Sequence, residues 1–430
     1  MFTFQDLEKA KKGEEKALRE FLLGAVQDYK LSKTYRDTID ALAYWRNENP
    51  TISKYRKLLY TVTGRAVPDN YSANYRLASN VYFRFVTQTV QYLLGYGARF
   101  EGDSTKKLLG GETFDHSLQE ALTDALNGGV AYGFMNLGHV EVFGAQEFVP
   151  LYDEETGELK TGIRFWQLDI DKPLRLTLYE LDGYTEYIKR RGEELSVMKP
   201  KRAYKQVVVK SDYSDDIVSD ENYERLPIVP LYSPRKQSGI VGLRRQIDCY
   251  DLIESGFAND IDDASMIYWT ISNAGGMDDI DLARFVEHMK TVKAAVIEDD
   301  GAKAESHTTE VPYQSREAML TRLENEMYRD FMVLNLDTVS GGTSTATAIK
   351  AAYEPMNLYS NMLEYSVLKF VHGLLDLIGV EDTCTFKRDT IVNEYEKAQT
   401  ERERVETALL LRGLFDDETI KALCAEALGI

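Results

Sequence analysis

The chain has 430 residues, 51 of them basic and 70 acidic, so its formal net charge is −19. No apolar run approaches the roughly 20 residues needed to span a bilayer, which argues against a membrane protein. Cys249, Cys384 and Cys424 are widely spaced without a CxxC pair, so structural zinc and a disulfide framework are disfavoured and synthesis in a reducing cytoplasm is expected.

The first 130 residues are predicted to be mainly helical. Residues 1–22 form a charged amphipathic pattern that lacks the apolar core of a signal peptide. Apolar residues at three- and four-residue spacing predict further helices, and Asn80 and Gly95 stand where one of them would be capped and stopped. These further helices are expected at 15–29, 34–48, 80–95 and 115–129.

From Tyr132 to Val209 the apolar period changes to two, which is typical of strands. Asp182-Gly183 is a strong hairpin signal, so we predict an antiparallel meander. The region lacks the alternation of strands and helices found in nucleotide-dependent folds. The acidic segment 211–224 is predicted to be a loop, and an extended connector is expected to follow because of its three prolines, Pro227, Pro230 and Pro234.

The helical period returns at Ile240. A helix is expected over 239–265, then a compact α/β insert over 266–312, then a second helix over 313–331. Two helices that flank an insert suggest a stalk with a separate module at its tip. A long helix is predicted over 345–379, and Pro355 should kink it because the proline removes an amide from the helical ladder.

The segment Ser340 to Lys350, SGGTSTATAIK, joins the second stalk helix to the long helix. Its two glycines and small hydroxyl residues predict a mobile loop at the start of a rigid rod. Free amides at a helix start can hold an anion, but Thr343 or Ser344 can equally serve as an ordinary helix cap. The GK[ST] sequence of a nucleotide-binding loop is missing.

Candidate metal ligands do not form a recognisable motif. No histidine pair has the four-residue spacing of a zinc site. An EF-hand loop that began at Asp260 would place Ser265 and Ile271 where Gly and a carboxylate are required. A solvated helix face is therefore the favoured use of the acidic clusters, although carboxylates from distant segments could still form a two-metal nuclease site. The clusters are Asp260, Asp262 and Asp263, and Asp278, Asp279 and Asp281.

The strong negative charge has two interpretations. A protein that grips nucleic acid is normally basic, so the simpler interpretation is an acidic protein without a nucleic-acid partner. Alternatively, an acidic wall suits a passage through which DNA must slide, because tight phosphate contacts would stall it.

Several segments, in order along the chain, resemble the portal protein family of long-tailed, siphovirus-type bacteriophages. The segment from Asn74 to Gly97 is similar to a family helix that ends in Tyr-Leu-Leu-Gly, and Leu226 to Ile271 is similar to the family's entry into its stem. The Ser340–Lys350 segment resembles the family's tunnel loop, with Thr345-Ala346 where relatives often have Gly-Val. A weaker similarity covers Phe386 to Gln399.

The resemblance implies a mainly helical α+β subunit of portal type. Its expected parts are a wing of helices and β meander (1–238), stem helices (239–265 and 313–331), a small α/β clip (266–312), a tunnel loop (332–344), a long kinked channel helix (345–379), and a wing return with a short helical crown (380–430). The residues expected at the channel are Asn335, Asp337, Thr338, Ser340, Gly341 and Gly342 in the loop, and Lys350 on the helix, with Pro355 at the kink.

The resemblance also implies partners and a location. The subunits would form a ring of twelve at one vertex of the virion capsid, after synthesis in the bacterial cytoplasm. Expected partners are double-stranded DNA in transit, the terminase large subunit, a head–tail adaptor, and the major capsid and scaffolding proteins. No cofactor, catalysis or membrane is expected.

Two other classes remain open on the sequence. A metal-dependent nucleic-acid enzyme would use the two aspartate clusters and show turnover that depends on divalent cations. An acidic scaffold or adaptor would assemble without a through-channel. A ring with an open axial hole in electron micrographs separates the portal from both alternatives.

Overall fold

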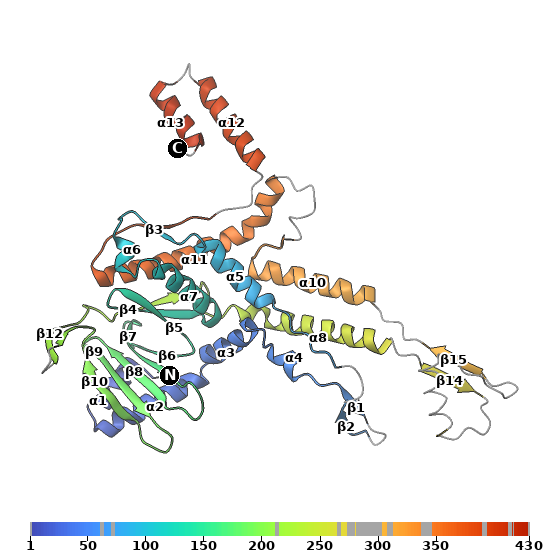
Figure 1. The fold of residues 1–430 in the computed structure, drawn as a ribbon, viewed down its shortest axis with the longest axis horizontal. Helices are drawn as coiled ribbons and strands as arrows, with labels where there is room; N and C mark the ends of the chain where they lie inside the picture. The colour runs from blue at the N-terminus through green and yellow to red at the C-terminus, as the bar shows by residue number, and fades with distance from the viewer. Residues whose placement is uncertain are drawn as a thin grey trace. The chain divides into compact units, whose positions relative to one another are not determined.

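The computed structural model describes residues 2–60, 64–69, 74–210, 215–264, 268–272, 280, 303–307, 313–336, 346–388, 394–411, 415 and 417–428. The chain divides into two compact units, whose helices and strands are labelled in Figure 1. The first contains residues 1–48, 80–244 and 325–430, and the second contains residues 49–79 and 245–324. Each unit is therefore assembled from segments that are distant in the sequence.

In the first unit, helices and antiparallel strands alternate in blocks, as expected. Its helices are α1 (Phe4–Lys11), α2 (Glu15–Leu31), α3 (Lys33–Trp45), α5 (Val81–Leu94), α6 (Thr105–Leu108), α7 (Thr113–Gly128), α11 (Ala346–Ile378), α12 (Glu394–Leu410) and α13 (Asp417–Leu428). Two further helices begin in one unit and end in the other: α8 (Ile240–Ala264) and α10 (Tyr313–Phe331). Thr3 and Asp6 form a capping box at the start of α1, and the N-terminal helical pattern is interrupted between Lys11, where α1 ends, and Glu15, where α2 begins.

The predicted meander of residues 132–209 divides between sheets, and residues 148–202 form a five-stranded sheet with the order β10-β9-β8-β7-β6. Its two-residue hairpin turn falls at Leu181-Asp182, directly before Gly183. Helices α1 and α2 cover one face, where Leu22 and Val26 pack among Leu151, Ile163 and Leu178 (Figure 1). The strands are β6 (Phe148–Tyr152), β7 (Leu159–Trp166), β8 (Leu174–Glu180), β9 (Gly183–Lys189) and β10 (Ser196–Arg202).

A second, three-stranded sheet has the order β13-β4-β5 and consists of β13 (Ile228–Tyr232), β4 (Val130–Asn136) and β5 (His139–Gly144). Pro230 lies in the edge strand β13, where the missing amide breaks no inner ladder. Both α7 and α11 pack on this sheet. Close approach of α11 requires glycine, since a Cβ on Gly133 would lie 2.4 Å from the ring of Phe370, and one on Gly373 would lie 2.7 Å from Val229.

The prediction of a loop over 211–224 is wrong for residues 215–221. They form β12 (Asp215–Glu221), which pairs antiparallel with β11 (Lys205–Lys210). The acidic composition concealed the strand, because backbone hydrogen bonds to β11 do not depend on side-chain polarity. A further pair joins β3 (Ala98–Phe100) to β16 (Cys384–Phe386).

The second unit contains α4 (Pro50–Lys54), the strand pair β1 (Leu58–Tyr60) and β2 (Ala66–Pro68), and the adjoining parts of α8 and α10. An ion pair between Arg316 and Asp260 holds α10 beside α8, and the Arg316 guanidinium lies 5.9 Å from the ring of Phe257. Within the predicted insert, β14 (Tyr268–Ser272) pairs antiparallel with β15 (Lys303–His307). This pairing brings the two ends of the insert together.

Candidate functional site

The C-terminal end of α10 is closed by a Schellman motif. The amide of Val333 donates to the carbonyl of Tyr328 (3.2 Å) and the amide of Met332 donates to that of Arg329 (3.2 Å). Met332 has φ +60°, a left-handed conformation that usually belongs to glycine and costs other residues about 1–2 kcal/mol. The chain thus leaves the helix at a defined angle, which directs the residues that follow toward the start of α11.

An aromatic cluster holds this end of α10 against α5 and α11. The ring of Phe331 lies 5.5 Å from Phe85, 6.2 Å from Tyr82 and 6.0 Å from Tyr359. Tyr82 and Phe85 are almost completely buried. Aromatic pairs at these separations stabilise a fold beyond the area they bury, so the end of α10 is firmly placed.

The residues after the Schellman motif remain attached to the first unit up to Leu336. Leu334 is buried with Tyr353 and Met356 of α11, and its carbonyl accepts a hydrogen bond from Gln88 Nε2 (3.2 Å). Asn335 donates from Nδ2 to Asn325 Oδ1 (3.3 Å), whereas Leu336 is 58% exposed. The transition from anchored to exposed chain therefore occurs at Asn335 and Leu336.

The beginning of α11 is held by α5. The Tyr92 hydroxyl donates to Asn357 Oδ1 (2.5 Å), and the rings of Tyr92 and Tyr353 lie 6.0 Å apart. Lys350, in the second turn of the helix, is exposed. The helix is continuous through Pro355, and the kink expected there stays a prediction.

Two of the predicted channel residues, Asn335 and Lys350, thus lie at the two ends of one connection between fixed helices. Asp337, Thr338, Ser340, Gly341 and Gly342 lie outside the described residues. Binding residues are often carried by loops whose ends are held in place by packed helices.

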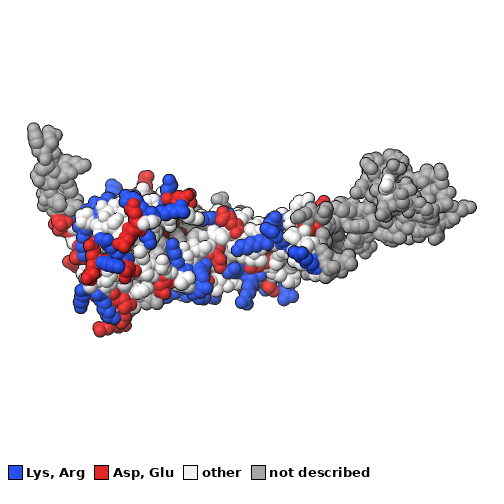
Figure 2. Space-filling model, turned by 90° about the horizontal axis from the view of Figure 1, so that it is seen from below, with Lys and Arg blue, Asp and Glu red and all other residues white. Residues whose placement is uncertain are grey.

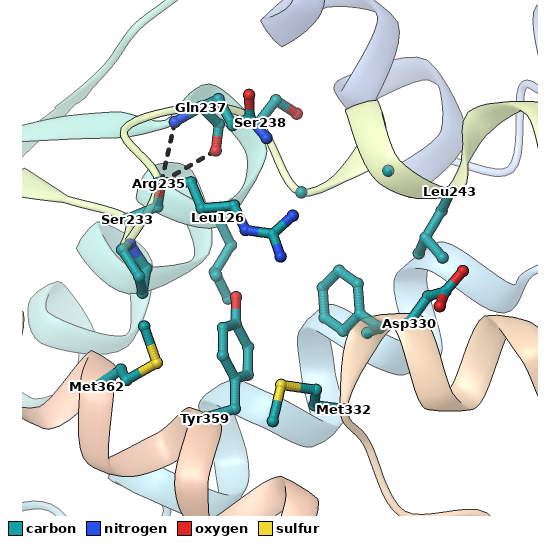
Figure 3. A pocket seen from close by; sticks show the side chains of 14 residues that line it. Leu126, Ser233, Arg235, Gln237, Ser238, Leu243, Asp330, Met332, Tyr359 and Met362 are labelled. Carbon is teal, nitrogen blue, oxygen red and sulfur yellow. Dashed lines mark hydrogen bonds between the residues drawn. The ribbon is translucent and has the colours of Figure 1, made fainter.

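Beside the end of α10 lies a pocket of about 120 Å³ (Figure 3). Its walls come from the turn before α8, from Asp330 to Met332, and from Tyr359 and Met362 of α11. Ser233 keeps the turn closed, because its Oγ donates to the Gln237 carbonyl (2.9 Å) and accepts from the Gln237 amide (3.2 Å). Burial raises the pKa of the Tyr359 hydroxyl and the positive charge of Arg235 lowers it, with a net value of about 12. The phenol therefore stays neutral.

The aspartate clusters do not form a metal site among the described residues, and no other group of three or more potential ligands does so there. Asp260 is paired with Arg316, and Asp278, Asp279 and Asp281 lie outside the described residues. Figure 2 shows acidic and basic side chains interspersed on the face that it presents.

One buried arrangement in the second unit was not predicted. Asp251, Ser255 and Asn259 follow one face of α8 at four-residue spacing and are at most 4% exposed. They bind the backbone of Ser79, Leu77 and Tyr75, which are alternate residues of an extended segment. We call these three helix residues and the segment that they bind the α8 ladder.

The spacing of the α8 ladder has a geometric reason. Four residues of helix advance about 6 Å, and two residues of extended chain advance about 6.6 Å, so the two repeats nearly coincide. Asn259 and Ser255 each donate to and accept from the backbone of their partner residue. Asp251 can only accept, so Asn49 donates to the carbonyl of Ser79 in its place (3.1 Å). Short polar residues repeated every four positions along an amphipathic helix were the available sequence signal.

Within the described residues, no helix is long and apolar enough to cross a membrane.

Comparisons with known proteins found similar sequences and a similar fold. The family model described as phage portal protein, SPP1 Gp6-like, matches residues 32–404. The portal protein of Clostridium phage phiCD119 is 24% identical over 396 residues, which cover 84% of this chain and 85% of that protein. A solved structure described as the neck of an empty GTA particle, computed with C6 symmetry, is similar with a TM-score of 0.52 at 11% identity and covers 91% of this chain and 93% of its own. At this identity the structural likeness concerns the fold alone.

Proposed function

The chain belongs to the SPP1 Gp6-like family of phage portal proteins, and from this premise we propose how its residues build a DNA channel at one vertex of the capsid. The observation that carries the proposal is the family match over residues 32–404. The mixed helical and antiparallel fold supports it. In the proposed assembly, twelve copies close into a ring through a heterologous interface, in which two different surfaces of each subunit meet.

We assign the parts of the subunit as follows. Residues 1–238 form the wing, α8 and α10 the stem, and residues 266–312 the clip, whose ends the pairing of β14 with β15 draws together. Residues 332–344 form the tunnel loop, α11 is the channel helix, and the segment after residue 380 returns to the wing and ends in a short crown.

The tunnel loop and the first turns of α11 face DNA in this proposal. Asn335 and Lys350 mark the two ends of the DNA-facing segment, and Asp337, Thr338, Ser340, Gly341 and Gly342 lie between them. The net charge of −19 keeps the channel from gripping phosphate, so DNA slides and no chemistry is required of the protein.

The portal has further partners on each side of the capsid wall. Terminase large subunit docks on the clip during packaging, and the head–tail adaptor takes the same position afterwards. The wing contacts the major capsid and scaffolding proteins. The mature protein resides in the virion, and its work requires no cofactor.

Electron microscopy of the purified protein tests the assembly. We expect closed rings with cyclic symmetry and an open axial hole. A monomer at all micromolar concentrations would contradict the portal proposal, and a closed particle without a hole would favour a scaffold or adaptor. Divalent-dependent cleavage of nucleic acid with a stoichiometric metal would instead favour the enzyme.

Changes in the tunnel loop should alter DNA movement and leave assembly intact. Gly341→Pro combined with Gly342→Pro removes backbone freedom, so less DNA should be packaged. Asp337→Lys adds one positive charge per subunit and should slow DNA most at low salt, where a phosphate contact is strongest. The measurement is packaged DNA length per head at low and high ionic strength. If both variants package the wild-type length of DNA in all conditions, the loop does not contact DNA and its assignment to the channel is wrong.

A further inference from the structure

One face of α11 carries a continuous row of exposed residues. Their spacing alternates between four and three, which keeps them in a single stripe along the helix, as in the seam of a coiled coil. The members of this stripe are Ala351, Pro355, Leu358, Met362, Tyr365, Lys369, His372 and Asp376, all of them exposed in the subunit.

The stripe changes character halfway along the helix. Its first five members are apolar, and its last three are polar or charged. Leu358, Met362 and Tyr365 are 51%, 52% and 77% exposed. We call the part from Ala351 to Tyr365 the apolar seam. A helix that faces water usually carries polar residues there, as the C-terminal half of the same stripe does.

The apolar seam is not part of the core of the subunit. The opposite face of α11 already packs inward through Met356, Leu363, Val367 and Phe370, which are at most 2% exposed. The helix is therefore apolar on two sides over residues 351–365 and on one side beyond them. An exposed apolar row beside a polar continuation marks a surface that another molecule covers.

We propose that the apolar seam of α11 is covered by a neighbouring copy of this chain and forms part of the contact that closes the ring. This inference rests on the proposed function, because ring closure places a second copy against every subunit. DNA is a poor occupant, since Leu, Met and Tyr side chains neutralise no phosphate and contacts to the DNA backbone are polar or charged. A coiled-coil type of spacing suits a helix or a ridge of protein as the covering surface.

A pair of matched substitutions tests the inference in the full-length protein. Tyr365→Glu places a carboxylate on the apolar seam, and Lys369→Glu places the same group one turn further along the same stripe. Tyr365 and Lys369 both point away from the core, so both variants should fold. Leu358→Glu repeats the test at a second position and avoids Met362, which also lines the pocket.

We expect Tyr365→Glu and Leu358→Glu to raise the concentration for half-assembly, measured by sedimentation velocity, by roughly tenfold or more, because a carboxylate would be buried without a partner. Lys369→Glu should assemble like wild type. Rings formed normally by both seam variants would overturn the inference and leave the portal function standing. Equal loss with Lys369→Glu would also overturn it. Wild-type protein that never forms rings would instead contradict the proposed function itself.

Crosslinking identifies the occupant directly. A photoreactive amino acid replaces Tyr365, and rings are formed from equal amounts of isotopically heavy and light subunits. Crosslinked peptides that pair a heavy with a light chain support a second copy. Pairs from a single chain alone would mean that another segment of the same subunit covers the seam, and crosslinks to packaged DNA or to capsid protein in assembled heads would likewise overturn the inference.

Discussion

Replacing Asp124 by asparagine should stabilise the folded protein by about 2–4 kcal/mol at pH 8 and change its stability little at pH 4. Asp124 lies on α7 and is partly buried. Burial, together with the negative charges of Glu120 and Glu147, raises the pKa of its carboxyl to about 7. Asparagine has nearly the same shape and cannot ionise, so it removes the cost of a charge in this position.

The direction of the pH effect follows from proton linkage. The pKa of Asp124 in the folded protein lies above the value of about 3.9 in an unfolded chain, so the folded state binds the proton more tightly. The contribution of the Asp124 carboxyl to the free energy of unfolding is fully present below pH 4 and is lost as the pH rises toward 7. Asparagine has no carboxyl to ionise, so the Asp124→Asn variant does not lose this stability. The difference in free energy of unfolding between the variant and the wild type therefore grows from pH 4 to pH 7.

Urea unfolding midpoints of both proteins, measured from pH 4 to pH 8 at one protein concentration, check this expectation. Asp103→Asn serves as the control, because it removes the same charge from an exposed position. A difference between wild type and Asp124→Asn that is equal at both ends of the range would contradict the proposed cause.

Replacing Asp251 by alanine should destabilise the second unit by about 2 kcal/mol. The carboxylate accepts hydrogen bonds from the Ser79 amide (3.0 Å) and from Asn49 Nδ2 (2.5 Å), and alanine leaves both donors without this acceptor. Burial raises the pKa of Asp251, so part of the loss is offset when the buried charge disappears. Asp251→Asn keeps one acceptor oxygen for Ser79 and should cost less than alanine.

Hydrogen exchange distinguishes a local from a general effect. In Asp251→Ala the amide of Ser79 should lose protection most, followed by those of Leu77 and Tyr75, because the α8 ladder holds all three. Leu252→Ala, at a partly exposed position next to Asp251, is the control and should leave these amides protected. Protection that is unchanged in Asp251→Ala would show that the segment is held by other contacts.

The long helices could be predicted from the sequence to within a residue or two. The bounds expected for α8, α10 and α11 (239–265, 313–331 and 345–379) agree with Ile240–Ala264, Tyr313–Phe331 and Ala346–Ile378. Periodic apolar residues determine helices locally, so no tertiary information is needed. The family match confirms the portal family resemblance. The resemblance could be seen in the sequence because several motifs keep their order along the chain, even though the portal protein of phage phiCD119 is only 24% identical.

Strand β12 and the α8 ladder could not be predicted in this way. Residues 215–221 are polar and acidic, and only the backbone of β11 makes them a strand. Asp251 and Ser79 are separated by 172 residues in the sequence, so the hydrogen bond between them has no local pattern. Of the predicted loop and channel-helix residues, Asn335 and Lys350 lie within the described part of the chain and Asp337 to Gly342 lie outside it, so their place at a channel stays a prediction.

The sequence by itself determined the order of the elements, the amphipathic pattern of each helix and the family, since these depend on residue type and spacing along one chain. Only the tertiary structure decided which apolar residues of α11 are core and which are surface. Met356 and Leu358 are both apolar and differ by only two positions, yet Met356 is 2% exposed and Leu358 is 51% exposed. The physical reason is that burial depends on the neighbours that other segments place against a face, and a helix with two apolar faces does not itself encode which of them its own subunit will cover.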